Sequence, residues 1–140
     1  MTKTINQITQ EWLFYALSDL RSAEQSDINH QVCFHFQQTA EKSLKAVLAW
    51  KNQVIPKTHS IWNLTNTVIK TAPNLSNKES LLDKARFLDQ FYVPSRYPDA
   101  LPGSLPEGLP SSSDAQKSLV AANRFYQLAL DITKLVPLEI

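Results

Sequence analysis

The sequence predicts an all-α fold: an antiparallel up-and-down bundle of four to five helices, with a long Pro-rich loop before the last helix. Two observations support this prediction. Seven of the ten Pro and Gly residues lie between Pro94 and Pro110, so the rest of the 140-residue chain lacks the regularly spaced turns of an all-β protein. Outside that segment, apolar residues recur at intervals of three and four, as they do on one face of a helix.

One domain, residues 1–140, accounts for the chain. Its residues are 43% hydrophobic, which is enough for a core, and no apolar run approaches the length of a membrane span. The first ten residues contain no apolar segment of the secretory type, and the lone Cys33 cannot form an internal disulfide framework. We therefore expect a cytoplasmic protein without a membrane helix.

The helices are expected at residues 5–25, 29–51 and 59–72, the third with Thr58 as its N-cap. A capping box at residues 76–79 begins the fourth helix, which Pro94 ends. A second capping box at residues 113–116 begins the last helix, which ends before Pro137. Residues 94–113 then form the Pro-rich insert.

The first helix carries an acidic residue within its apolar stripe. That stripe is expected to contain Ile8, Trp12, Tyr15, Ala16, Leu20 and Ala23. Asp19 lies inside it, so we expect a buried carboxylate that needs a cation. The candidate cations are Lys42, Lys45 and Arg96.

Aromatic residues are more numerous than the expected stripes require. The surplus consists of Trp12, Trp50, Trp62, Phe87, Phe91 and Phe125. A monomer would expose part of this set as a patch, so we expect a homodimer.

Positive charge is concentrated in one part of the chain. The formal net charge is only +1, yet six lysines and no acidic residue lie between Lys42 and Lys78. Such a block can attract phosphate, although solvated lysines on helix surfaces would give the same pattern.

A second feature that could bind an anion is the predicted start of the third helix, where Thr58 and His59 follow Lys57. Alternatively, Thr58 only caps the helix and His59 hydrogen-bonds a carboxylate. We expect chain reversal at residues 52–57 to lay this helix beside the second. His59 would then lie beyond the end of the helix face that carries Lys42 and Lys45.

The sequence Arg96-Tyr97-Pro98-Asp99 places a guanidinium beside a phenol and a carboxylate. This arginine could clamp a phosphate or stack on a base, or it could pair with Asp19 or Glu41 and hold the loop to the bundle.

Sequence patterns typical of catalysis are missing. The chain has no glycine-rich phosphate loop, no Gly-x-Ser-x-Gly and no histidine pair at i, i+4 with a Glu. His30 and His35 lie about 140° apart around a helix, so they cannot share one metal with Cys33. We assign no catalytic residue, no metal and no cofactor.

Four segments together resemble the HEPN domain, whose name stands for higher eukaryotes and prokaryotes nucleotide-binding. They are Trp12-x-x-x-Ala16-x-x-Asp19-Leu20-x-x-Ala23, Phe34-x-x-Gln37-Gln38-x-Ala40-Glu41-Lys42-x-Leu44-Lys45-Ala46, Lys57-Thr58-His59-Ser60-Ile61 and Arg96-Tyr97-Pro98-Asp99. The last segment indicates the branch of the family with an Arg-Tyr-Pro-Asp motif. The resemblance implies a bundle of about five helices, commonly a homodimer, and often a complex with a minimal nucleotidyltransferase in a toxin–antitoxin-like pair.

Three functions follow as alternatives. The preferred one is a nucleotide- or nucleic-acid-associated binding module. The second is a ribonuclease toxin, since some HEPN proteins cleave RNA with an Arg followed four to six residues later by a His. No histidine follows Arg96, so His59 would have to replace it. The third is a purely structural helical dimer.

The residues assigned to the candidate site fall into two groups. Those expected to bind a ligand are Lys42, Lys45, His59, Arg96 and Tyr97. Those expected to hold the structure through polar contacts are Asp19, Gln38, Glu41 and Asp99.

Overall fold

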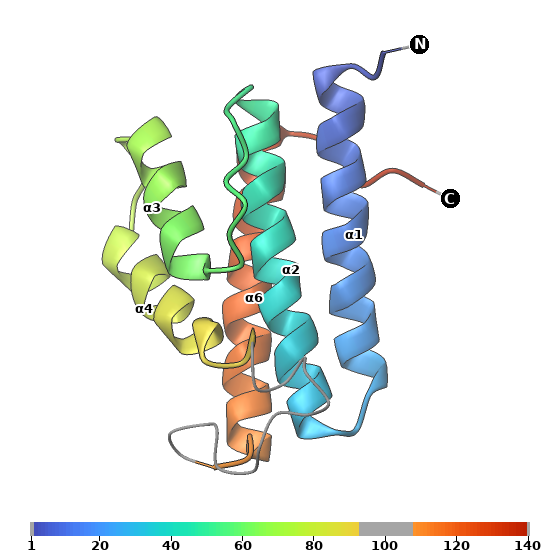
Figure 1. Cartoon of the computed structure of the whole chain (residues 1–140), viewed down its shortest axis with the longest axis vertical. Helices are drawn as coiled ribbons and strands as arrows, with labels where there is room; N and C mark the ends of the chain where they lie inside the picture. Colours follow the sequence, from blue (N-terminus) through green and yellow to red (C-terminus); the bar gives the residue numbers. More distant parts are fainter. Residues whose placement is uncertain (1, 93–107, 140) are drawn as a thin grey trace.

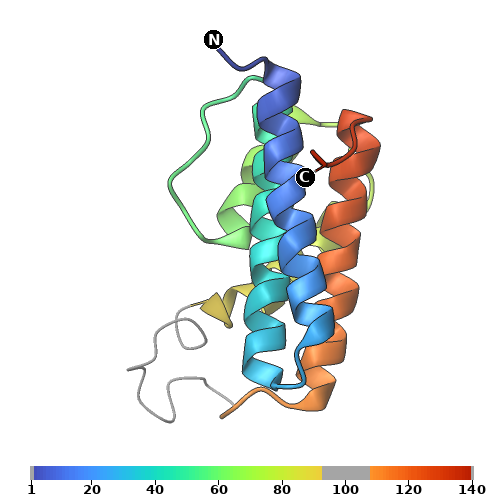
Figure 2. The same cartoon turned by 90° about the vertical axis from the view of Figure 1, so that its right-hand side faces the viewer.

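The computed structural model describes residues 2–92 and 108–139, and its elements in this part of the chain are helices. In chain order they are α1 (Ile5–Gln25), α2 (Asn29–Trp50), α3 (Ile61–Thr71), α4 (Lys78–Asp89) and α6 (Ser112–Thr133). The all-α prediction is confirmed. Figures 1 and 2 show that α1, α2 and α6 are long neighbouring helices, and that the shorter α3 and α4 lie to one side of them. The predicted insert, residues 94–113, lies mostly outside the described residues.

The first two helices lie where the sequence predicts them, whereas the other helix starts differ. The N-cap of α3 is Ser60 and not Thr58, because the Ser60 hydroxyl accepts the Asn63 N–H. The last helix begins earlier than expected, with a capping box formed by Ser111 and Asp114. The predicted box before α4 does not form, because Asn77 precedes that helix in the left-handed region without a side-chain cap.

Helix α2 is the centre of the bundle. It packs against α1, α3, α4 and α6, and it is buried on nearly every side from Phe36 to Ala49. Small side chains such as Ala40 and Ala46, neither of which is exposed, allow the neighbouring helices to approach closely. The sequence suggested this position, since the second stripe of the helix is short-chained or amphipathic.

The buried face of α1 is rotated from the predicted one. The structure buries Thr9, Leu13, Ala16, Leu20 and Ala23. Ile8 is 36% exposed and Tyr15 is 54% exposed, so the prediction was wrong for these two residues. Helix α1 has two apolar faces, and periodicity alone does not show which of them meets α2. The surplus of aromatic residues was also overestimated, because Phe91 and Phe125 are fully buried.

The connection from α2 to α3 sets the position of the site. Residues 51–60 run back along α2, so that α3 then points in the same direction as α2 (Figure 1). Two hydrogen bonds fix this parallel arrangement. Near the start of α3, Gln37 donates to the carbonyl of His59 at 2.8 Å, and near its end Lys51 donates to the carbonyl of Thr71 at 3.1 Å. His59 therefore lies beside the middle of α2 and not beyond its polar face as expected.

Among the described residues, no helix is both long enough and apolar enough to cross a membrane.

Candidate ligand-binding site

The centre of the candidate site is a buried carboxylate on α2. The side chain of Glu41 is only 5% exposed, and an ion there needs partners that replace its lost hydration. Lys45, one turn later on the same helix, supplies a positive charge 3.0 Å from Oε2. The Nδ1 atom of His59 lies 3.1 Å from Oε1. The carboxylate thus joins α2 to the residues that precede α3.

Two glutamines of α2 complete this network. Gln38 Nε2 lies 3.3 Å from Glu41 Oε1 and donates to the Gln37 side-chain oxygen at 2.8 Å. Gln37 in turn donates to the backbone carbonyl of His59. Both ends of His59, the ring and the carbonyl, are therefore held by α2, which fixes the orientation of the imidazole.

The N-terminus of α3 already carries an anion from the protein itself. The Asp89 carboxylate, at the end of α4, accepts hydrogen bonds from the N–H groups of Ile61 and Trp62 at 2.6 and 3.1 Å. It also accepts from the Ser60 hydroxyl at 3.1 Å. From the sequence, this helix start was one of the places where a phosphate could bind. In the structure the Ile61 and Trp62 N–H groups bind the Asp89 carboxylate, so the helix N-terminus joins α3 to α4.

Burial raises the pKa of Asp89 above its ordinary value, and the nearby Glu41 carboxylate raises it further, while the hydrogen bonds from α3 act in the opposite direction. A single cluster thus contains two carboxylates with different neutralising groups. Glu41 is paired with the Lys45 amine and lies within hydrogen-bond distance of the His59 ring, whereas Asp89 faces a helix N-terminus.

The His59 ring lies at the surface of this cluster. Its side chain is 50% exposed, and its plane is stacked on Tyr92 with centroids 4.4 Å apart and an interplanar angle of 13°. His59, Ser60, Asp89 and Tyr92 line a cleft of about 240 Å³. Because Nδ1 is directed at Glu41, Nε2 is the ring nitrogen left to meet a ligand.

A second carboxylate cluster joins α1 to α2. Asp19, whose side chain is 12% exposed, pairs with Lys42 through Oδ2 and lies 2.9 Å from His35 Nδ1 through Oδ1. The prediction that Asp19 pairs with a cation is confirmed, and of the two candidates that the structure describes, Lys42 and Lys45, its partner is Lys42.

His35 was not identified from the sequence as a partner of Asp19. His35 and Lys42 are seven positions apart on α2, so they lie on one face of the helix, about two turns apart, and both reach the same carboxylate. The spacing was visible in the sequence, but only the packing of α1 against α2 shows that one carboxylate serves both side chains.

Lys42 and Lys45, which the sequence predicted to bind a ligand together, each pair with a different carboxylate of the protein. Lys45 is 7% exposed and its amine is held by Glu41, and the Lys42 amine is held by Asp19. The structure therefore brings Lys45 and His59 together around Glu41, while Lys42 belongs to the second cluster. The other three predicted site residues, Arg96, Tyr97 and Asp99, lie outside the described residues.

Tyr92 and Asp89 complete the site but were not identified from the sequence as site residues. Asp89 ends α4 and Tyr92 follows it closely, and only the packing of that helix against α3 brings them to His59 and Ser60. No local spacing could have indicated them.

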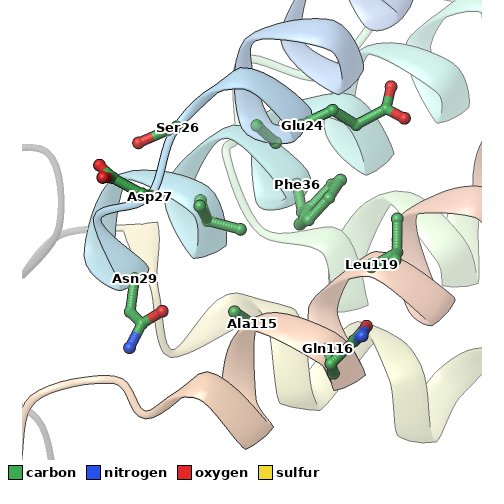
Figure 3. A pocket seen from close by; sticks show the side chains of 10 residues that line it. Glu24, Ser26, Asp27, Asn29, Phe36, Ala115, Gln116 and Leu119 are labelled. Carbon is green, nitrogen blue, oxygen red and sulfur yellow. The ribbon is translucent and has the colours of Figure 1, made fainter.

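A larger cavity than the His59 cleft lies at the end of the α1 and α2 pair where the two helices are connected. Figure 3 shows it between the α1–α2 connection and the start of α6, with an apolar floor that includes Phe36 and Leu119. Its volume is about 380 Å³, and Glu24 and Asp27 supply acidic groups at its rim. It is separate from the residues of the His59 cleft.

The HEPN domain model matches residues 9–132 of the sequence. The chain belongs to the HEPN family. The fold is similar to the crystal structure of TT1696 from Thermus thermophilus, with 28% identity, a TM-score of 0.73, and coverage of 89% of this chain and 97% of that one. It is also similar to ST0689, an archaeal HEPN homologue, with 26% identity, a TM-score of 0.66, and coverage of 88% and 95%. Comparison with curated proteins gave no match.

The Asp19 cluster of this HEPN domain should contribute to stability. Asp19→Ala leaves the Lys42 amine without its carboxylate, so we expect the free energy of unfolding to fall by about 3 kcal/mol. Asp27→Ala, at an exposed position, is the matched control and should change it by less than about 0.5 kcal/mol. Urea denaturation measures both variants, and equal small effects would contradict the assigned role of Asp19.

The raised pKa of Asp89 predicts a pH dependence of stability. Between its unfolded value of 3.8 and the higher folded pKa, the folded chain binds more protons than the unfolded chain. The contribution of this group is therefore complete below pH 3.8 and is lost as the pH rises through the folded pKa. The stability of the wild type relative to Asp89→Asn should fall as the pH is raised across that window.

Denaturation midpoints at a series of pH values measure this difference. Asp83→Asn, on the same helix with a side chain 78% exposed, is the control and should show no such trend. A difference between wild type and Asp89→Asn that stays constant or grows with pH would refute the prediction.

Proposed function

We propose that this HEPN protein is a binding module for a nucleotide or nucleic acid, that it acts as a homodimer, and that its partner is a minimal nucleotidyltransferase in a toxin–antitoxin-like pair. The observation that carries the proposal is the half-exposed His59 ring, stacked on Tyr92 and fixed by the buried Glu41. Membership of the HEPN family supports the same function.

The arrangement of His59 suits a phosphate ester with a flat ring. An imidazole can donate from Nε2 to a phosphate oxygen when it is protonated, and its plane can stack on a base. Lys45 neutralises the charge of Glu41, so this carboxylate does not repel a phosphate as an unpaired negative charge would. In this proposal Lys45 acts on the ligand through Glu41 and His59, and Lys42 adds positive charge from the second cluster.

Arg96 and Tyr97 are part of the proposed site on grounds of sequence. They follow Tyr92 by four and five residues, so the chain cannot carry them farther from it than about 14 to 18 Å. A guanidinium within that reach can bind the phosphate of a ligand whose base lies on His59. Asp99 remains a proposed structural partner.

Titration with nucleotides and short RNA tests the binding proposal. His59→Ala and Arg96→Ala should each weaken binding about tenfold or more, because each removes a charge-assisted hydrogen bond to phosphate. His30→Ala and Arg21→Ala, at exposed positions elsewhere, are the matched controls and should bind as the wild type does. Equal binding by all five proteins, or none, would favour a purely structural dimer.

The homodimer is supported by the outer face of α1. Ile5, Ile8 and Tyr15 are 42%, 36% and 54% exposed, and together with Trp12 they recur at intervals of three and four. Such a stripe can pack against a copy of itself.

Light scattering should therefore give about twice the 15.9 kDa of one chain at micromolar concentration. Tyr15→Glu places a charge in the stripe and should shift the mass to that of one chain. Val120→Glu, on α6 at a position 60% exposed, is the control and should leave the mass unchanged. A single-chain mass for the wild type would overturn the dimer.

Ribonuclease activity is a second candidate, and the Glu41–His59 pair is the observation that favours it. A carboxylate that holds Nδ1 orients the imidazole and leaves Nε2 able to take a proton, as a general base requires. Cleavage of the RNA during the titration by the wild type, and its loss in His59→Ala, would support this function.

The proposed partner is tested by co-purification. A nucleotidyltransferase identified by mass spectrometry in the purified complex would support it.

A further inference from the structure

The His59 and Tyr92 stack is one end of a longer row of rings. Tyr92 is followed by Phe34 at a centroid distance of 6.4 Å and an angle of 36°. Phe34 is followed by His35 at 5.5 Å and 61°. The row His59–Tyr92–Phe34–His35 thus connects the start of α3, the end of α4 and the first part of α2, which lie far apart in the sequence.

The two ends of this aromatic row are alike. Each end is an imidazole whose Nδ1 lies within hydrogen-bond distance of a carboxylate, Glu41 for His59 and Asp19 for His35. Each carboxylate is also paired with a lysine of α2. The side chains of the end rings are 50% and 30% exposed, so both ends reach the surface.

We propose that the aromatic row is a binding platform for a single-stranded oligonucleotide, with Phe34 and His35 as site residues in addition to His59 and Tyr92. This inference rests on the proposed binding function and extends its site across α2. Stacked rings bind the bases, and the Nε2 atoms of the two imidazoles meet backbone phosphates.

The dimensions and chemistry of the row favour this ligand. Neighbouring rings of the row lie 4.4, 6.4 and 5.5 Å apart, so the four rings offer more than one position on which a base can stack. A single strand alternates flat rings with phosphates, which matches rings flanked by imidazoles. The carboxylates that hold the two imidazoles, Asp19 and Glu41, are each paired with a lysine. Asp89, which also lines the His59 cleft, is held by the N–H groups of Ile61 and Trp62.

Titration with adenosine monophosphate and the trinucleotide ApApA tests the inference. The cleft lined by His59, Ser60, Asp89 and Tyr92 places the mononucleotide at the His59 end of the row, whereas the trinucleotide can extend from there to His35. Phe34→Leu and His35→Ala should each lower the affinity for ApApA about tenfold and leave that for the mononucleotide unchanged. Phe34→Tyr keeps the ring and should bind both ligands as the wild type does. His30→Ala, an exposed histidine on the same helix, is the control.

The outcomes separate this inference from the proposed function. If the wild type binds ApApA but Phe34→Leu and His35→Ala bind it equally well, the platform is wrong while the binding function stands. ApApA binding no tighter than the mononucleotide has the same meaning. If the wild type binds neither ligand, the proposed function fails and the platform with it. Thermal unfolding of each variant shows whether a loss of binding comes from misfolding. If Phe34→Leu does not fold, the affinity of His35→Ala for ApApA decides, and Phe34→Tyr is its folded control.

Discussion

The buried carboxylate of Glu41 is the constraint on which the arrangement of this region depends. A charge on the central helix with a side chain only 5% exposed requires neighbours that offset its desolvation, and α2 alone supplies Lys45 and Gln38. The remaining partner, His59, comes from the segment before α3. Neutralising one charge therefore also fixes the path of residues 51–60 along α2 and the direction in which α3 starts.

The sequence predicted the helices well because their apolar periodicity is local. It placed α1 and the start of α2 correctly and indicated that α2 is central. It did not predict the parallel course of α3, because residues 51–60 have no periodicity and their path is set by contacts such as that of Gln37 with the His59 carbonyl. The same reason explains the helix starts, where several Ser and Thr residues compete as caps and tertiary packing selects one.

The candidate site was predictable only in part. Asp19 could be singled out because a carboxylate within an apolar stripe needs a partner. His59 could be singled out by its place at the start of the third helix, and Glu41 by its place in the HEPN-like segment of α2. Which partner each one takes could not be read from spacing, since Asp89 and Tyr92 arrive from α4 and their contacts with α3 depend on the packing of both helices. The sequence indicated that the start of α3 could bind an anion, and in the structure that anion is the Asp89 carboxylate of the protein itself.

The lysine-rich segment shows why composition alone overstates an anion-binding surface. Of its six lysines, Lys42 and Lys45 are paired with carboxylates, and Lys51 and Lys78 donate to backbone carbonyls of Thr71 and Pro73. Each of these four amines thus makes a contact within the fold, and these contacts hold helices and loops together. Recognition of a phosphate ligand then depends on groups that the fold leaves at the surface. The His59 imidazole combines exposure, fixed orientation and an aromatic neighbour, as His35 does at the other end of the aromatic row.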